Sequence, residues 1–257
     1  MVNFVGAGPG AVDLITIRGM ELLKKGDVII YAGSLVNPDL LKYAKEGADI
    51  YNSATMTLNE ILEVMIKAVR AGKEVVRLHT GEPSIYGAVR EQMDALDREG
   101  IEYASCPGVS ACFGAAASLN LEYTLPDVTQ TLIITRLSGK TKVPEKERIE
   151  LLAGHGSSMA IYLSAGMLDE LSDRLQRGGY DSNTPAAIVY KATWPEEKRI
   201  LCSIGNMAEK ARQENITKTA IVLIGDAINC SNYQKSRLYD PTFSTEFRSA
   251  GSTDSGI

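Results

Sequence analysis

The first 119 residues alternate short apolar strands with segments of helical periodicity, and this order restricts the fold more than any other feature of the chain. Strands are expected at residues 3–5, 28–31, 75–78 and 101–105. The helices expected between and after them cover residues 14–24, 38–44, 58–69, 86–96 and 110–119. Strands that alternate with helices imply crossover connections and parallel pairing. The sequence therefore predicts an α/β domain with a mostly parallel sheet.

The second half of the chain has a different character. Its apolar strands are expected at residues 132–135, 159–163, 187–190, 200–203 and 220–224, and its helices at residues 146–153, 167–177 and 206–215. The polar link around residues 194–197 is too short for a crossover and suits an antiparallel hairpin, which predicts a mixed sheet. We expect two α/β domains, residues 1–119 and 120–230, and a polar tail over residues 231–257. The end of this tail, residues 249–257, is expected to be disordered.

Three of the expected strands in the first domain end in segments rich in glycine and proline. These segments are residues 6–10, 80–87 and 107–111. Open α/β sheets bind ligands at the carboxyl ends of their strands. Glycines also let a ligand approach the main chain closely. The pattern predicts a ligand site at this edge of the sheet, built largely from main-chain groups.

The segment at residues 6–10 has the look of a dinucleotide-binding loop, but the details disagree. The fingerprint needs a glycine where the chain has Ala11, and Pro9 lacks an amide that could bind phosphate. Residues 31–33, which end the second strand, offer no carboxylate for a ribose hydroxyl. The loop is therefore expected to shape a site rather than cradle a pyrophosphate, with a plain strand-to-helix turn as the alternative.

The other two segments also allow more than one interpretation. In residues 80–87, Glu82 can accept hydrogen bonds from a ligand, or it can favour the dipole of the following helix in its first turn. Ser110 is a candidate N-cap for the helix after it, and the small residues beyond leave room for a ligand. In both segments a helix-forming role and a binding role are compatible.

Composition limits the chemistry that the chain can perform. The 257 residues include 44% apolar and 23% charged residues and carry a net charge of −5, which does not favour nucleic acid as a partner. No apolar stretch approaches the ~20 residues of a membrane span, so we expect a cytoplasmic protein. The two histidines, His79 and His155, form no catalytic set, and His79 is interpreted mainly as a structural residue at a strand end. The four cysteines lack metal-ligand spacing, so reduced thiols and no metal site are expected.

Taken in this order and spacing, the strand ends resemble those of the tetrapyrrole (corrin and porphyrin) methylases over residues 1–230. Further segments are similar to the family members that methylate C11 of precorrin-4 or of its cobalt form. These segments are residues 31–36, 79–83, 129–131 and 189–195, of which the last is the most distinctive. Two positions depart from the family, because Glu82 stands in a turn that usually has Asp and Ala11 replaces a frequent acidic residue.

The resemblance implies two α/β domains, a homodimer, and S-adenosylmethionine bound in a cleft between the domains, with S-adenosylhomocysteine as its product. From the first domain it implies cofactor contacts by Pro9, Thr80, Gly81, Glu82, Ile85, Ser110 and Ala111. From the second domain it implies contacts by Leu163, Tyr190, Ala192, Thr193 and Ala220.

The implied reaction also sets what the side chains must do. Methyl transfer from a sulfonium to a ring carbon depends mainly on positioning, so no catalytic side chain is predicted. A tetrapyrrole substrate carries many carboxylates, which basic residues can orient, although a run of basic residues is usually a solvated surface. The candidates are Arg136, Lys140, Lys142 and Lys191. The alternatives are the same fold acting on another precorrin or on uroporphyrinogen III, and a non-catalytic module that binds S-adenosylmethionine or a corrinoid.

Overall fold

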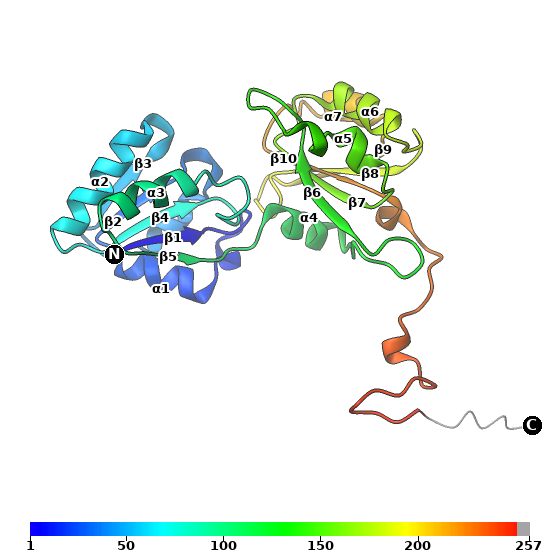
Figure 1. Cartoon of the computed structure of the whole chain (residues 1–257), viewed down its shortest axis with the longest axis horizontal. Coiled ribbons are helices and arrows are strands. Elements are labelled where there is room, and N and C mark those ends of the chain that lie inside the picture. Colours follow the sequence, from blue (N-terminus) through cyan, green and yellow to red (C-terminus); the bar gives the residue numbers. More distant parts are fainter. Residues whose placement is uncertain (251–257) are drawn as a thin grey trace, which may run out of the picture. The chain divides into compact units, whose positions relative to one another are not determined.

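The computed structural model describes residues 1–250, which fold as two compact units (Figure 1). The first unit contains Met1–Asn120 together with Ile188–Ile200 and Ile216–Ile221. The second contains Leu121–Ala187, Leu201–Asn215 and the chain from Val222 onward. The first unit thus includes two segments from the second half of the sequence. Disorder was predicted for residues 249–257, and residues 251–257 of this stretch lie outside the described part of the chain.

A parallel sheet forms the centre of the first unit. Its five strands lie in the order β3-β2-β4-β1-β5. They are β1 (Val2–Gly6), β2 (Val28–Tyr31), β3 (Asp49–Asn52), β4 (Val75–His79) and β5 (Tyr103–Cys106). The pairs of β1 with β4 and β5, and of β2 with β3 and β4, are all parallel. The predicted parallel sheet is confirmed.

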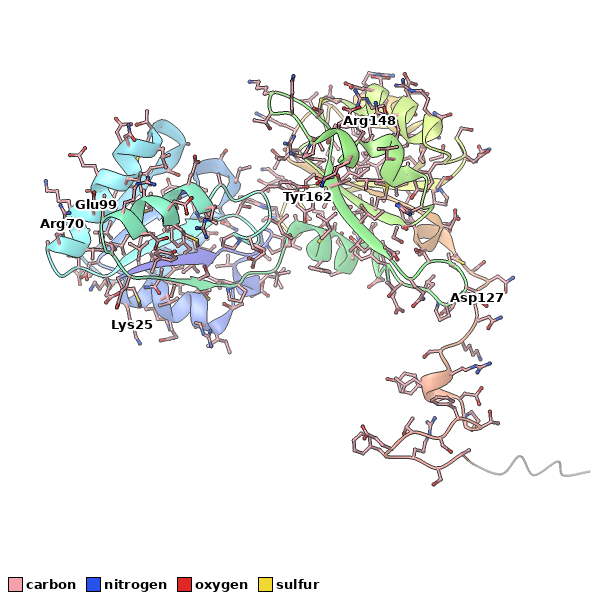
Figure 2. All side chains as sticks on the ribbon, in the orientation of Figure 1. Lys25, Arg70, Glu99, Asp127, Arg148 and Tyr162 are labelled. Carbon is pink, nitrogen blue, oxygen red and sulfur yellow. The ribbon has the colours of Figure 1, made fainter. Side chains whose placement is uncertain are left out.

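Helices cover both faces of this sheet (Figure 1). They are α1 (Ile17–Lys25), α2 (Leu58–Arg70) and α3 (Arg90–Arg98), and α4 (Ala111–Leu119) follows β5. Because side chains alternate along a strand, β1 sends Phe4 into a core with Met65 of α2 and Leu96 of α3. Val5 enters the opposite core, with Leu23 of α1. An ion pair of 2.5 Å between Arg70 and Glu99 joins α2 to the end of α3 (Figure 2).

The second sheet is mixed, as predicted. Its order is β6-β7-β10-β8-β9, with β6 and β7 parallel and β7 and β10 antiparallel. The strands are β6 (Leu132–Arg136), β7 (Ser158–Tyr162), β8 (Pro185–Tyr190), β9 (Lys198–Ser203) and β10 (Ala220–Ile224). The helices are α5 (Ile149–Ala153), α6 (Leu168–Arg177) and α7 (Met207–Gln213). The neighbouring positions of β8 and β9 agree with the predicted hairpin.

Three local expectations differ from the structure. The strand β3 was not predicted, because all four of its residues are exposed at the sheet edge and it has no apolar face. The segment Pro38–Tyr43 is a 3₁₀-helix rather than an α-helix. The helix expected from residue 86 begins only at Arg90, since Tyr86 and Ala88 have φ of 56° and 49°, which no helix accommodates.

The polar tail contains local structure that its sequence did not reveal. The Arg248 guanidinium donates to the carbonyls of Leu238 and Asp240 at 2.8 Å and of Phe243 at 3.4 Å. This single side chain closes a loop that leaves Phe247 92% exposed. Over residues 1–250, no helix is long and apolar enough to cross a membrane.

Candidate functional site

The sheet register brings the three glycine-rich strand ends together. The strand β1 lies between β4 and β5, so that Gly6 pairs with His79 and Val5 with Cys106. Because these strands are parallel, the loops that follow them leave the sheet at the same edge. The predicted assembly of residues 6–10, 80–87 and 107–111 at one edge therefore follows directly from the register.

Main-chain contacts interlock these loops. The Gly8 and Gly81 amides donate to each other's carbonyl oxygens at 3.3 and 2.8 Å. A Cβ atom on Gly6 would lie 2.6 Å from the Gly108 Cα, and one on Gly108 would lie 2.2 Å from the Gly81 oxygen. The glycines at positions 6 and 108 thus let one loop approach another, where the sequence suggested room for a ligand. Gly81 is different, because its φ of +59° requires glycine while its surroundings leave ordinary contact distances.

Glu82 fastens two of the loops to each other. One carboxylate oxygen accepts from the Gly108 amide at 2.8 Å and the other from the Ser84 amide at 2.9 Å. Partial burial favours the neutral acid, but hydrogen bonds from the Gly108 amide and from the amide and side chain of Ser84 together outweigh it and lower the pKa of Glu82. Both oxygens therefore hold main-chain amides of the loops, a role that neither of the two interpretations drawn from the sequence included.

The segment after β8 holds the loop after β1. The Thr193 hydroxyl accepts from the Ala11 amide at 2.9 Å, and Trp194 Nε1 donates to the Pro9 carbonyl at 3.0 Å. The indole also covers Gly10, where a Cβ would lie 2.0 Å from its ring. Asn37, which is buried, donates to the Gly10 carbonyl at 2.9 Å. Three side chains from distant parts of the sequence thus fix one loop.

Strained backbone marks the same segments. Nine non-glycine residues among those described have positive φ, and three of them are Asn or Asp, which tolerate it. The other six are Tyr86, Ala88, Leu163, Lys191, Thr193 and Thr219. Each lies within three residues of a predicted cofactor contact. Because such conformations cost about 1–3 kcal/mol each and concentrate at binding sites, they favour a ligand-binding role for these segments.

Comparison with known proteins identifies the family. The family model of the tetrapyrrole (corrin/porphyrin) methylases matches residues 1–208. The chain belongs to the tetrapyrrole methylases. Among its relatives is the cobalt-precorrin-4 C(11)-methyltransferase of Methanocaldococcus jannaschii, 53% identical over 247 residues that cover 96% of this chain and 95% of that protein.

Solved structures of tetrapyrrole methylases agree with this assignment. The structure of a cobalt precorrin-4 methyltransferase, a cobalamin biosynthetic enzyme, matches with a TM-score of 0.87 and 42% identity, covering 89% of this chain and 96% of that one. A uroporphyrin-III C-methyltransferase from Thermus thermophilus, complexed with S-adenosylhomocysteine, has a TM-score of 0.73 and 25% identity, with coverage of 89% and 93%. The resemblance inferred from the sequence is confirmed.

The structure divides the predicted cofactor residues of this methylase into two groups. Pro9, Gly81, Glu82 and Thr193 use polar groups to hold the loops together. The remaining eight differ in exposure. Thr80 and Ile85 line a cavity, Ser110 and Ala192 are buried, and the partly or largely exposed ones are Ala111, Leu163, Tyr190 and Ala220. All but Leu163 belong to the first unit, and Leu163 follows β7 in the second with a side chain that is 68% exposed. Ser110 occupies the predicted N-cap position of α4.

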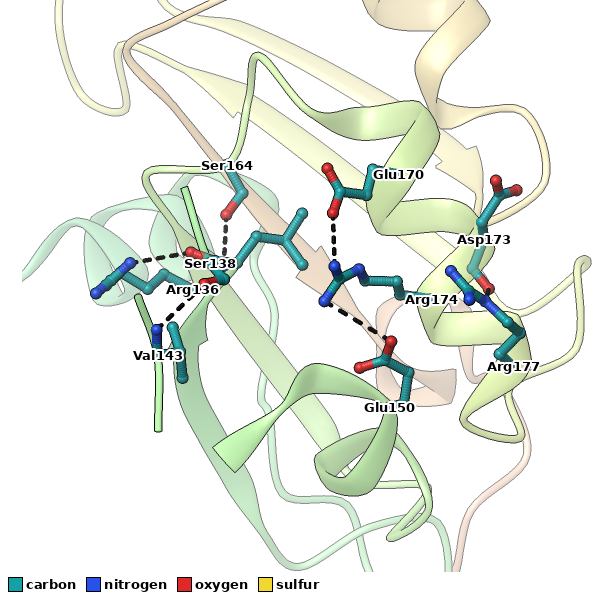
Figure 3. Close-up of polar contacts among 10 residues, drawn as sticks. Arg136, Ser138, Val143, Glu150, Ser164, Glu170, Asp173, Arg174 and Arg177 are labelled. Carbon is teal, nitrogen blue, oxygen red and sulfur yellow. Dashed lines mark hydrogen bonds and ion pairs between the residues drawn. The ribbon is translucent and has the colours of Figure 1, made fainter. Parts of the chain in front are cut away.

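The predicted substrate-binding residues lie in different units. Arg136, drawn in Figure 3, belongs to the second unit. Its guanidinium donates to the carbonyls of Leu137, Thr141 and Lys142 and so organises the loop after β6. Lys140 and Lys142 lie exposed in this loop. Lys191 belongs to the first unit, 5.1 Å from the centre of the Trp194 ring and 3.6 Å from a Glu196 oxygen.

Asn37, Trp194 and Glu197 were not predicted as site residues. Glu197 accepts from the Thr193 amide at 2.6 Å and so supports the strained turn. Trp194 lies in residues 189–195, the most distinctive segment of the family resemblance, and this was the sequence signal that pointed to it. All four cysteines are free thiols, and residues 1–250 contain no group of three or more potential ligands arranged to hold a metal.

Proposed function

We propose that this methylase transfers a methyl group from S-adenosylmethionine to C11 of cobalt-precorrin-4, or of metal-free precorrin-4, in cobalamin biosynthesis. The observation that carries the proposal is the 53% identity, over nearly the full length of both chains, to a protein named for this reaction. The products are cobalt-precorrin-5A, or precorrin-5, and S-adenosylhomocysteine.

The residues of the first unit fit a cofactor that is bound mainly by the main chain. Five of the six strained residues lie in this unit, and together with the left-handed Gly81 they give it a fixed backbone surface. When bound, S-adenosylmethionine supplies an already activated methyl group on its sulfonium. We propose that Thr80, Ile85, Ser110, Ala111, Leu163, Tyr190, Ala192 and Ala220 contact it, and that Pro9, Gly81, Glu82 and Thr193 fix the loops that do so.

The chain's own contribution to the reaction is positioning. A sulfonium methyl needs no general acid, so holding the ring carbon in line with the S–CH₃ bond is the main requirement. Glu82, Trp194 and Asn37 keep the loops rigid, which reduces the ordering that must occur when the ligands bind. We propose Arg136, Lys140, Lys142 and Lys191 as the residues that orient the substrate carboxylates.

The setting of the protein is also part of the proposal. We propose a cytoplasmic homodimer that acts on a small molecule and binds neither nucleic acid nor membrane. The net charge of −5 supports the exclusion of nucleic acid. Sedimentation of the purified protein tests the dimer, and a monomer at micromolar concentration would contradict it.

A label-transfer assay tests the activity. The protein is incubated with S-adenosylmethionine labelled in its methyl group and either cobalt-precorrin-4 or uroporphyrinogen III. We expect label in the cobalt-precorrin-4 product and little in uroporphyrinogen III. Preferred labelling of uroporphyrinogen III would support the alternative that the same fold acts on uroporphyrinogen III. Binding of S-adenosylmethionine without methyl transfer would support a non-catalytic module.

A further inference from the structure

A cavity of about 310 Å³ lies within the first unit, beside the carboxyl ends of β2 and β4. Apolar side chains line part of it, including Leu35, Ile61 and Ile85. Its polar lining includes Arg77 and His79 from β4 and Gln92 from α3. We call it the Arg77–His79 cavity.

The two residues that name the cavity share one face of the sheet. They are two positions apart on β4, so their side chains point to the same side, and each is only 5% exposed. The Arg77 guanidinium donates to the Gln92 Oε1 at 3.3 Å and to the Ile30 carbonyl at 3.1 Å, which are both neutral acceptors. Within residues 1–250, no carboxylate forms an ion pair with Arg77. A buried cation without an anion is costly, and burial lowers the pKa of Arg77 to about 10.

His79 adds a second buried polar group without a matching partner to the same cavity. Its Nε2 is buried and has no hydrogen-bond partner. Burial, with the nearby charge of Arg77, lowers the pKa of His79 to about 3, so the ring is neutral at physiological pH and carries one N–H. Buried polar atoms are normally paired, so an unpaired one in a cavity points to a missing ligand atom.

We propose that the Arg77–His79 cavity receives one carboxylate side chain of the tetrapyrrole, with His79 Nε2–H as the hydrogen-bond donor and Arg77 as the buried counter-charge. This inference rests on the proposed function, because it assigns the carboxylate to the substrate of that reaction. The cavity lies at the lower end of the size range of small-molecule pockets, so it suits one arm of a macrocycle and not the whole ring. An arm anchored here limits which ring carbon can face the methyl donor, which makes His79 a positioning residue.

The carboxylate of S-adenosylmethionine offers the same chemistry, but its other charges do not fit. It lies close to an ammonium and a sulfonium, which the buried guanidinium of Arg77 would repel. The tetrapyrrole arms carry negative charge alone. Glu91, the acidic residue of the cavity lining, is exposed to solvent and does not neutralise Arg77.

Substitution of His79 tests the proposal with two ligands. The dissociation constant of S-adenosylhomocysteine is measured by calorimetry, that of the stable tetracyclic polycarboxylate uroporphyrin III by fluorescence, and the KM for cobalt-precorrin-4 by turnover. His79→Leu should weaken both tetrapyrrole measures by about 10- to 100-fold, the loss of one charge-assisted hydrogen bond, and change S-adenosylhomocysteine affinity less than twofold. His79→Gln should recover part of the loss, because its amide N–H can donate. His155→Leu, at an exposed position, is the matched control.

The outcomes separate this inference from the proposed function. Unchanged tetrapyrrole affinity in His79→Leu would overturn the inference. If the affinity for S-adenosylhomocysteine fell while the tetrapyrrole affinity stayed the same, the cofactor's carboxylate would occupy the cavity, and the inference would again be overturned. If His79→Leu does not fold, Ala32→Leu, which fills the cavity and leaves the buried pair intact, should cause the same selective loss. Failure of the wild type to methylate cobalt-precorrin-4 would refute the proposed function, while the uroporphyrin III series would still decide whether the cavity takes a carboxylate.

Discussion

Glu82 offers the sharpest test of how the site is held together. Its carboxylate accepts hydrogen bonds from the Gly108 amide at 2.8 Å and the Ser84 amide at 2.9 Å, so Glu82→Ala removes a side chain that ties these two loops. Hydrogen bonds to a charged group contribute about 1.5–3 kcal/mol each when buried, and less at a half-exposed position. We therefore expect a loss of about 2–3 kcal/mol in the free energy of unfolding, which lowers the Tm by roughly 4–12 °C.

A series of variants separates the effect of the charge at position 82 from the effect of the side-chain length. Glu82→Gln keeps one acceptor oxygen and should lose about half as much stability, roughly 1–1.5 kcal/mol. Glu82→Asp keeps the charge but is one C–C bond shorter, so it should fall between wild type and Glu82→Ala. The affinity for S-adenosylhomocysteine, measured by calorimetry, should fall about tenfold in Glu82→Ala because binding must then order the loop.

The pH dependence gives an independent check on the same contact. The pKa of Glu82 is lowered in the folded protein, so its contribution is fully present above the ordinary value of 4.5 and is lost as the pH falls from there through the lowered pKa. The difference in Tm between wild type and Glu82→Gln should therefore shrink below pH 4.5. Unchanged Tm and unchanged affinity in Glu82→Ala at pH 7 would refute the account of these loops.

Three further predictions follow from the same structure. Gly108→Ala places a Cβ 2.2 Å from a backbone oxygen and should cost more than about 3 kcal/mol or prevent folding, whereas Gly139→Ala, where the nearest atom is 3.6 Å away, should change the Tm by less than about 2 °C. Trp194→Phe removes one hydrogen bond to the loop after β1 and should cost about 0.5–1.5 kcal/mol in chemical denaturation, so a neutral result would contradict the clamp. Because the pKa of His79 falls to about 3, the folded protein should lose up to about 1.4 kcal/mol of stability per pH unit below 6.5 through this group. His79→Gln should flatten that slope between pH 4 and 6.5 and His155→Gln should not, and identical slopes in both variants would refute the assignment.

Much of the architecture was predictable because it depends on local periodicity. The apolar runs at β1, β2, β4 and β5, separated by helical stripes, predicted the parallel sheet, and the parallel order in turn predicted that the glycine-rich loops meet at one edge. The edge strand β3 escaped prediction because exposed strands need no apolar pattern. The early part of the helix expected from residue 86 was wrong because strain at Tyr86 and Ala88 is imposed by the surrounding loop.

The internal organisation of the site was less predictable, because it depends on contacts between segments far apart in sequence. Nothing local to Gly6 or Gly108 reveals that they face each other, and the two readings of Glu82 were equally open until its partners were known. The contacts of Trp194 with Pro9 and of Asn37 with Gly10 span 185 and 27 residues. The sequence likewise could not reveal that Arg77 and the unpartnered nitrogen of His79 share one cavity, because periodicity alone does not show that both side chains are buried.

The most direct test of the proposed reaction is to locate the transferred methyl group. S-adenosylmethionine carrying a ¹³C-labelled methyl is incubated with cobalt-precorrin-4 and the wild-type protein, and the product is examined by NMR. The account predicts one new ¹³C methyl attached to C11 for each S-adenosylhomocysteine released. A methyl at any other ring carbon, or release of S-adenosylhomocysteine without a methylated tetrapyrrole, would contradict it.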